Sequence, residues 1–358
     1  AFMLAACGAS PSSTASQAGS GTSAAADGSA VTIKLGGIGP ITGSTAVYGE
    51  AVMNGAQIAV DEINASDSAV KFEYNFQDDE GDAETAVNAY NILKDWGMQV
   101  LMGTVTTAPC LAVISETEAD NMFQITPSAS STDVIVPDNV FQVCFTDPNQ
   151  GVSAADYIAD NGLATKVAAI YDSSDAYSSG IYNAFAAEAE AKGLEIVCAE
   201  AFTADNKTDF RTQLQKAQSA GADLVFLPIY YQEAALILTQ ADQLGYEPLF
   251  FGCDGMALDN FDTALAEGLM LMTPFNATSE DERTANFVQE YEEKFGGTPN
   301  QFAADAYDAV YAIRDAFVQA GVTSDMSVSE IGDALITSIT EITMDGLTGS
   351  DMTWASTG

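Results

Sequence analysis

Short β-branched runs alternate with amphipathic segments over residues 31–251, and this alternation limits the possible folds more than any other feature of the sequence. The run Leu224–Leu227 has the length of a buried strand. The segment Asp82–Trp96 places apolar side chains such as Ala86 and Leu93 on one face of a helix. Strands that alternate with helices form parallel sheets covered by helices. The pattern runs twice, so it predicts an α/β fold of two αβα lobes with parallel central sheets.

The predicted elements fall into two blocks of about 120 residues each. In the first block we expect strands at 32–35, 70–76, 100–102, 123–125 and 140–143, a loop at 38–43, and helices at 50–64, 82–96 and 108–119. In the second block we expect strands at 166–171, 195–199, 224–227 and 249–251, and helices at 152–158, 180–192, 210–220 and 233–244.

After Thr273 the sequence predicts helices without strands between them. Capping boxes at 279–282 and 327–330 each open a helix, and a long amphipathic helix is expected at 302–319. These helices cannot form a sheet, so the chain should return to the first lobe. We therefore expect one lobe from 31–147 plus 275–350 and another from 148–274, joined by a hinge of several crossings around a cleft. No closing strand follows, and we expect a truncated C-terminus.

The first thirty residues are expected to lie outside the fold. An apolar run ends in Leu4-Ala5-Ala6-Cys7, which resembles the lipobox of bacterial lipoproteins, where the cysteine receives a lipid. The alternative is the end of an ordinary signal peptide with a chance cysteine. Residues 9–30 are almost entirely Ser, Ala, Gly and Thr, a composition typical of a flexible tether. No later segment approaches 18 consecutive apolar residues, so we expect no membrane span.

Composition excludes several kinds of function. The chain has 11 Lys+Arg against 51 Asp+Glu, a formal net charge of −40, and no histidine. A nucleic-acid-binding face needs clustered cations, so we expect no nucleic-acid partner. The missing histidine excludes Ser–His and Cys–His nucleophile pairs and His-ligated metal sites.

The remaining motifs predict structure rather than catalysis. The acidic run 78–82 lacks EF-hand spacing, and its last residue, Asp82, is expected to cap a helix. There is no phosphate-binding glycine loop and no G-x-S-x-G elbow. We expect no enzyme, metal or cofactor; a hydrolase using two carboxylates is the enzymatic alternative. Four further cysteines are expected in the core, with disulfides left open: Cys110, Cys144, Cys198 and Cys253.

Polar and aromatic side chains follow six of the predicted strands, where ligands of open α/β sheets bind. They are Tyr48, Thr106, Thr107, Ser128, Ser130, Tyr177, Tyr230 and Asp254. The small hydroxyls belong to the first lobe and suit a carboxylate, together with neighbouring backbone N–H groups. Asp254 belongs to the second lobe, and an acid beside tyrosines suits an ammonium. The arrangement predicts a zwitterion held across a cleft, which is an α-amino acid.

An ordered series of motifs covers residues 31–349: Ile38–Gly43, Tyr48–Glu50, Gly55–Asn64, Gln77–Asp79, Ile125–Ser130, Ile170–Asp172, Asp175–Ser178, Thr208–Phe210 and Gly252–Gly255. On these residues the chain resembles the type I periplasmic-binding-protein superfamily, and within it the Leu/Ile/Val-binding receptors of branched-chain amino acid ABC transporters.

The resemblance implies a role for each site residue. Thr107 and Ser130 would hold the ligand carboxylate, with main-chain contact at Ser128. Asp254 and Tyr177 would hold the ammonium. The side-chain pocket would be walled by three aromatic residues: Tyr48, Tyr230 and Phe302.

Two departures from the receptors are visible. Asp254 stands where they carry Glu, which leaves about one methylene of reach to be supplied otherwise. Cysteines near 79–82 and at position 106, needed for the disulfide of those receptors, are absent.

We therefore expect a monomeric receptor that is lipid-anchored through Cys7 to the outer face of the cytoplasmic membrane. It would capture a neutral, branched-chain amino acid and deliver it to an ABC transporter permease. The alternatives within this fold are a receptor for a short-chain amide, urea or aromatic acid, and a sensory subunit.

Overall fold

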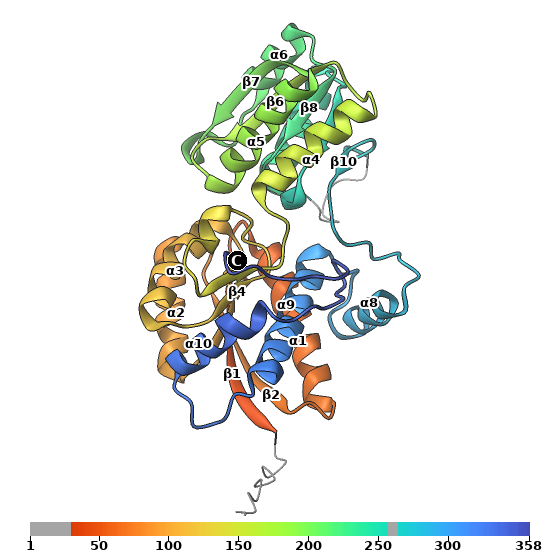
Figure 1. The fold of residues 1–358 in the computed structure, drawn as a ribbon. Helices are drawn as coiled ribbons and strands as arrows, with labels where there is room; N and C mark the ends of the chain where they lie inside the picture. Colours follow the sequence, from red (N-terminus) through yellow and green to blue (C-terminus); the bar gives the residue numbers. More distant parts are fainter. Residues whose placement is uncertain (1–29, 257–263) are drawn as a thin grey trace, which may run out of the picture.

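Two α/β lobes, one above the other, make up the protein in its computed structural model, which describes residues 30–256 and 264–358 (Figure 1). Each lobe contains a five-stranded sheet in which every neighbouring pair of strands is parallel. The prediction of two αβα lobes with parallel sheets is confirmed. The predicted lipobox at Cys7 and its tether lie outside the described residues.

The first lobe is built around a sheet of strand order β2-β1-β3-β4-β5. Its strands are β1 Val31–Gly39, β2 Val70–Asp78, β3 Val100–Gly103, β4 Gln124–Thr126 and β5 Val140–Gln142. Its helices include α1 Ala46–Ala65, α2 Ala83–Trp96 and α3 Thr107–Asp120, with a 3-10 turn η1 at Thr132–Ile135. Asp82 caps α2 as expected, because its carboxylate accepts a hydrogen bond from the Thr85 N–H at 2.9 Å.

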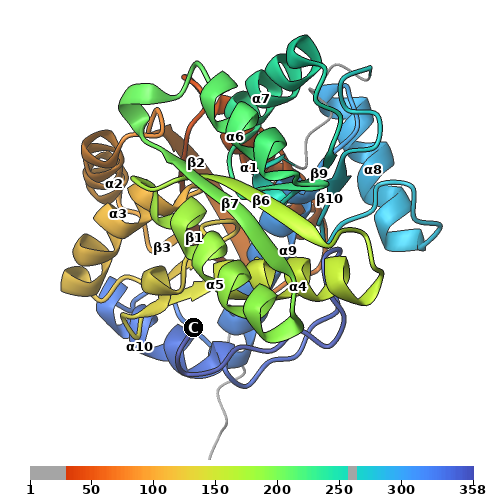
Figure 2. The ribbon, with the colours of Figure 1, turned by 90° about the horizontal axis from the view of Figure 1, so that it is seen from above.

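The second lobe has strand order β10-β9-β8-β6-β7. Its strands are β6 Lys166–Asp172, β7 Glu195–Phe202, β8 Leu224–Leu227, β9 Leu249–Gly252 and β10 Met270–Leu271. Its helices are α4 Asp147–Asp160, α5 Ala176–Lys192, α6 Arg211–Ala220 and α7 Tyr231–Leu244, with 3-10 turns η2 at Ala204–Asn206 and η3 at Asp254–Met256. Seen from above, this lobe covers the first lobe (Figure 2).

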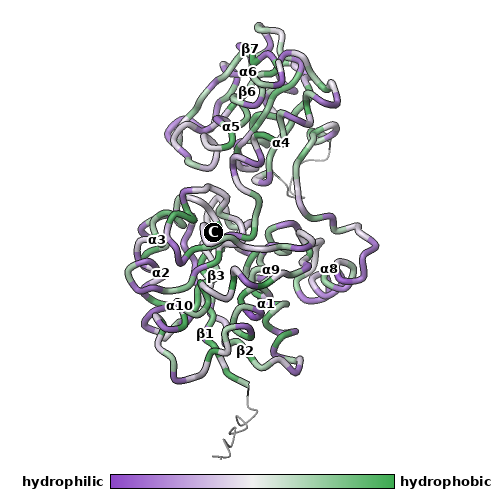
Figure 3. The backbone as a smooth tube through the Cα atoms, in the orientation of Figure 1, coloured by the Kyte–Doolittle hydropathy of each residue, from purple (hydrophilic) through white to green (hydrophobic). Residues whose placement is uncertain are grey.

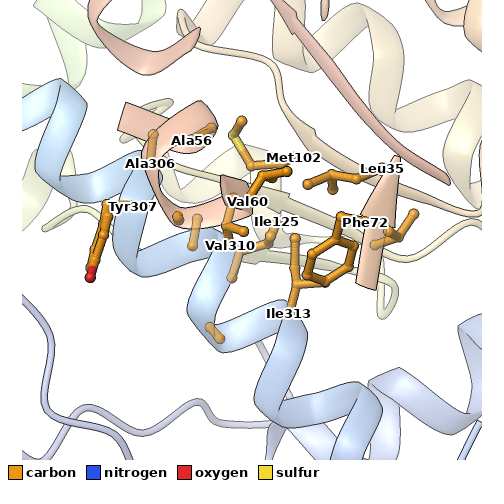
Figure 4. Packing of buried hydrophobic residues seen from close by; sticks show 14 of the residues in the cluster. Leu35, Ala56, Val60, Phe72, Met102, Ile125, Ala306, Tyr307, Val310 and Ile313 are labelled. Atoms are coloured by element: carbon orange, nitrogen blue, oxygen red, sulfur yellow. The ribbon is translucent and has the colours of Figure 1, made fainter. Parts of the chain in front are cut away.

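Three C-terminal helices return to the first lobe: α8 Glu282–Phe295, α9 Gln301–Ala320 and α10 Val328–Ile339. Helix α9 is buried along most of its length, and its apolar side chains interleave with those of α1 and the sheet (Figure 4). After α10 the chain stays with this lobe, where the Trp354 indole N–H donates to the Gln142 carbonyl at 3.0 Å. The first lobe therefore has a core assembled from both ends of the described chain.

Two connections join the lobes within residues 30–256 and 264–358. One runs from β5 to α4, and the other runs from β10 to α8 (Figure 1). Apolar residues follow the central strands of both lobes, while hydrophilic residues dominate the outer turns of the helices (Figure 3). We propose the lobe limits 31–147 plus 275–350 and 148–274; the limit at 274/275 falls in the second connection, and the limit at 147/148 falls at the start of α4, just after the first.

Some predicted element limits are wrong. Strand β1 continues to Gly39, into the predicted loop, because residues 36–38 pair with both β2 and β3 and Gly39 pairs with β2. Helix α8 begins at Glu282 with Asp281 as its N-cap, so no capping box forms from Ser279. The short strand β10 was not predicted. By contrast, the capping box at Ser327 is confirmed, since Ser327 and Glu330 bond each other's backbone N–H groups.

The cysteines among the described residues are free thiols. Cys110, Cys144 and Cys253 are buried and pack as small apolar groups, as expected. Cys198, on β7, is only partly buried.

Gly55 marks the closest approach of α1 to α9, and it yields a test of this packing. A Cβ at position 55 would lie 2.0 Å from the Ala303 carbonyl oxygen, and a backbone oxygen cannot rotate away. Overpacking lowers stability by about 1–3 kcal/mol, whereas replacing a glycine inside a helix by alanine raises it by about 1 kcal/mol. We expect Gly55→Ala to lower the free energy of unfolding in urea by about 2 kcal/mol. Glu50→Ala, at an exposed position of α1, should leave it nearly unchanged; equal stability of both variants would contradict the packing.

Candidate ligand-binding site

A small cavity lies between the lobes, where the carboxyl ends of both sheets face each other. Its lining residues are Tyr48, Val105, Thr106, Thr107, Ser128, Tyr177, Tyr230, Asp254, Gly255 and Phe302. Eight of the nine residues expected at the site are among them, and Ser130 is not. The free volume of the cavity is about 10 Å³, roughly the space that one water molecule needs, so in this arrangement of the lobes the lining residues nearly fill the site.

The first-lobe side of the cavity is formed by the N-terminus of α3 and the turn after β4. Thr106 occupies the N-cap position of α3, but its hydroxyl forms no cap bond and is buried without a partner. Thr107 begins the helix and is 1% exposed. The first N–H groups of a helix carry partial positive charge, so this end of the cavity favours an anionic group.

Ser128 and Ser130 differ in what their side chains do. The Ser128 hydroxyl donates to the Val105 carbonyl at 2.7 Å, so it is already engaged by the protein. Ser130 is 1% exposed and does not line the cavity; among the described residues its hydroxyl makes no hydrogen bond of ordinary geometry, but it lies near enough to the Asp147 carboxyl to lower the pKa of that carboxyl. Its carbonyl accepts the N–H of Asp147 at 2.9 Å. Ser130 therefore contacts the start of α4, at the first connection between the lobes, and does not line the cavity.

The second-lobe side presents a buried carboxyl. Asp254, in η3 directly after β9, is 2% exposed. Its Oδ1 accepts hydrogen bonds from the Tyr177 hydroxyl at 2.6 Å and from the Gly255 N–H at 2.7 Å. Burial raises the pKa of Asp254 to about 6, although these hydrogen bonds oppose the rise. At neutral pH the carboxyl is largely ionised and attracts a cationic group.

Aromatic rings close the remaining sides. Tyr48 packs edge-on against Phe302 with ring centroids 4.9 Å apart, and it lies 5.7 Å from Tyr230. Tyr230 in turn stacks on Tyr177 at 4.9 Å. Phe302 is placed by the first turn of α9, where the Asn300 side chain accepts its N–H. These rings make an apolar wall between the two polar ends.

Asp147 is a buried acid near the site that the sequence reasoning missed. It is the first residue of α4 and is 1% exposed; among the described residues its carboxylate makes no hydrogen bond of ordinary geometry, although the nearby Ser130 hydroxyl lowers its pKa. Burial raises its pKa to about 8, and the negative charge of Asp254 adds to the rise. Its position after strand β5 could have identified it, because the other site residues also follow strands. It was overlooked because it lies where the chain passes from the first lobe to the second.

A second opening adjoins the cavity and shares Thr106 and Tyr230 with it. It has a volume of about 260 Å³ and lies between the lobes. Four acids and one lysine line it: Glu80, Asp172, Asp175, Glu233 and Lys207. The lysine pairs with Glu233 at 3.0 Å. This opening is the mouth of the cleft, and its negative charge favours approach of ligands that carry a cationic group.

The cavity offers complementary surroundings for a small dipolar molecule. One end presents helix N–H groups and a free hydroxyl, the other an ionised carboxyl, and aromatic rings lie between. Two parallel α/β lobes around such an interlobe cavity define the class of type I periplasmic binding proteins. Among residues 30–256 and 264–358, no helix has both the length and the apolarity that crossing a membrane requires.

Comparison with known proteins agrees with this class. The profile of the family described as "Periplasmic binding protein" matches residues 32–358. The chain is 30% identical to the Leu/Ile/Val-binding protein homolog 3 of Brucella melitensis, over 82% of this chain and 80% of that protein. It is 28% identical to the leucine-, isoleucine-, valine-, threonine-, and alanine-binding protein of Pseudomonas aeruginosa, over 84% and 81% of the two chains.

A solved structure shows the same fold. The branched-chain amino acid transporter substrate-binding protein LivJ of Streptococcus pneumoniae, in complex with isoleucine, superposes with a TM-score of 0.77 at 28% identity, covering 89% of this chain and 91% of that one. The chain therefore belongs to the periplasmic binding protein family and is similar to its branched-chain amino acid-binding members.

The buried acids predict an unusual dependence of stability on pH. Asp147 has a folded-state pKa of about 8 and an ordinary pKa of 3.8. Between these values the folded state binds more protons than the unfolded state, so stability falls as pH rises. One such group removes up to about 1.4 kcal/mol per pH unit. We expect Asp147→Asn to flatten the fall in unfolding free energy between pH 5 and pH 8.

Asp67→Asn, which removes the same charge from an exposed loop, is the control. It should preserve the wild-type slope in urea unfolding measured at each pH. Parallel slopes for wild type and Asp147→Asn would show that the Asp147 carboxyl is not held neutral in the folded protein.

Proposed function

We propose that this chain is the solute-binding protein of an ABC transporter and that it binds a neutral, branched-chain amino acid in the cavity between its lobes. The observation that carries this proposal is the buried Asp254 carboxyl facing the N-terminus of α3 across an aromatic-walled cavity. In the proposed complex, Asp254 accepts the ligand ammonium, and Thr106, Thr107 and the α3 N–H groups receive its carboxylate.

The wall limits what the ligand's side chain can be. Tyr48, Tyr230 and Phe302 present ring faces and edges to the cavity, which suit an aliphatic group. The apolar character of this wall therefore favours leucine, isoleucine and valine over amino acids with polar side chains.

Ser130 has a less direct part than the resemblance implies. Its hydroxyl lies beside Asp147 rather than in the cavity lining. It could reach a ligand carboxylate after a change of rotamer, and we retain it as a proposed carboxylate contact. With a pKa of about 8, Asp147 is mostly protonated at neutral pH, so the negative charge of the site comes from Asp254.

The relatives support the wider assignment. The proteins of Brucella melitensis and Pseudomonas aeruginosa bear names of amino acid-binding proteins, and the S. pneumoniae structure holds isoleucine. We further propose that the receptor is extracytoplasmic, acts as a monomer, delivers its ligand to a permease, and is anchored by lipid at Cys7.

Calorimetric titration with each of the twenty amino acids tests the ligand assignment. We expect saturable heat with leucine, isoleucine and valine, and little or none with acidic amino acids, whose extra charge would meet the aromatic wall. Absence of heat from all twenty would overturn the proposed ligand class.

Replacing the acid tests the ammonium site. Asp254→Ala leaves a buried ammonium without its partner, so we expect a loss of about 2–5 kcal/mol in binding free energy for isoleucine. Asp242→Ala, which removes an exposed acid from α7 of the same lobe, should bind as the wild type does. Equal affinity of the two variants would show that Asp254 does not hold the ligand.

The same carboxyl predicts a pH dependence of binding. With a pKa of about 6, Asp254 must lose its proton before it can pair with an ammonium. We expect the dissociation constant for isoleucine to rise roughly tenfold between pH 7 and pH 5. Titrations at intermediate pH should give a midpoint near 6, and a constant affinity over this range would contradict the assignment.

A further inference from the structure

The Tyr48 hydroxyl makes two hydrogen bonds to the opposite lobe. Tyr48 belongs to α1 of the first lobe, and its hydroxyl donates to the Gly255 carbonyl at 2.5 Å. The same oxygen accepts the backbone N–H of Tyr231 at 3.2 Å. Both partners belong to the second lobe, Gly255 in the turn after β9 and Tyr231 at the start of α7. One phenol oxygen thus connects the two lobes beside the cavity.

The Gly255 residue that Tyr48 contacts also belongs to the proposed ammonium site. Its N–H donates to Asp254 Oδ1 at 2.7 Å and to the Tyr177 hydroxyl at 3.0 Å. Its carbonyl is the acceptor for Tyr48. A side chain at this position would put a Cβ 2.7 Å from the Tyr177 hydroxyl oxygen, so the close approach requires glycine. The orientation of this one residue depends on Asp254 on one side and on Tyr48 on the other.

The bond to Gly255 is buried, and the bond from Tyr231 is partly buried. Tyr48 is 1% exposed and its ring is held by Tyr230, Tyr231 and Phe302. Burial raises the pKa of the Tyr48 phenol well above its ordinary value, so the hydroxyl keeps its proton and stays a donor. Removing the hydroxyl would leave the buried Gly255 carbonyl and the partly buried Tyr231 N–H without that partner. This loss is costly while the lobes are together and costs little once water reaches both groups.

We propose that Tyr48 is a positioning residue that couples occupancy of the ammonium site to closure of the lobes, acting through the backbone of Gly255. A ligand ammonium on Asp254 fixes the η3 turn, and the fixed turn presents the Gly255 carbonyl to Tyr48. This role is distinct from the ring's contribution to the cavity wall, and it rests on the proposed function only for the identity of the ligand that occupies Asp254.

Tyr48→Phe separates the two roles, because it keeps the ring and removes the hydroxyl. We expect isoleucine to dissociate about tenfold faster, equivalent to about 1.4 kcal/mol, with its association rate within twofold of the wild type. The measurement is stopped-flow fluorescence with isoleucine as the probe. Tyr246→Phe is the matched control, since it removes a buried phenol that donates to the Ala222 carbonyl at 3.0 Å within one lobe.

Hydrogen–deuterium exchange gives a readout that does not depend on the ligand. Because the Tyr231 N–H donates to Tyr48, Tyr48→Phe should speed exchange of the peptide that spans residues 229–233, while Tyr246→Phe should leave it unchanged. In the wild type, isoleucine should slow exchange of the same peptide, a measurement that needs no variant.

The outcomes separate this inference from the proposed function. If the wild type binds no amino acid, the proposed function fails, and exchange at residues 229–233 in Tyr48→Phe alone decides whether the hydroxyl holds the lobes together. If the wild type binds isoleucine and Tyr48→Phe dissociates at the wild-type rate, the coupling is overturned. A loss of affinity confined to the association rate would also overturn it, because that result reports only a change in the cavity wall.

Discussion

An ionised carboxyl at the meeting point of two lobes is the constraint on which the site depends. Asp254 is nearly inaccessible to water, and two hydrogen bonds from Tyr177 and Gly255 only partly replace its hydration. Its raised pKa records that deficit. In the proposed complex, the ligand ammonium offsets this deficit and the helix terminus across the cavity receives the ligand carboxylate. The proposed recognition of a zwitterion thus rests on one buried acid opposite one helix N-terminus.

The scaffold holds these groups at the correct separation by local means. Parallel strands bring Thr106, Ser128, Tyr177, Tyr230 and Asp254 to facing sheet edges, because each residue follows its strand by a few positions. The aromatic wall crosses the boundary between lobes, with Tyr48 and Phe302 from one side and Tyr230 from the other. Any shift of one lobe against the other therefore changes the polar ends and the wall together.

Much of the fold and of the cavity lining could be predicted from the sequence, because strand and helix periodicities are local and residues after parallel strands share one sheet edge. The features that could not be predicted depend on the surrounding structure rather than on the local sequence pattern. Ser279 and Ser327 carry the same capping pattern, but Asp281, two residues after Ser279, takes the N-cap of α8 instead. Strand β1 extends past its apolar run because two neighbouring strands pair with its glycines. Ser130 and Asp147 lie beside each other only because the first connection brings them together.

The discontinuity of the first lobe has a consequence for the order in which the chain can acquire structure during synthesis. Helix α9 completes that lobe's core by packing Ala303 against Gly55, almost 250 positions earlier along the chain. The second lobe is continuous between the two connections, so its contacts join residues that are closer in sequence. All of its residues have been synthesised before helix α9 appears. On a ribosome or a translocation channel, the part emerging first must wait with its apolar surface uncovered until the last third has appeared. We expect such a chain to need shielding of its apolar surface during synthesis for longer than a chain in which each lobe is continuous in sequence.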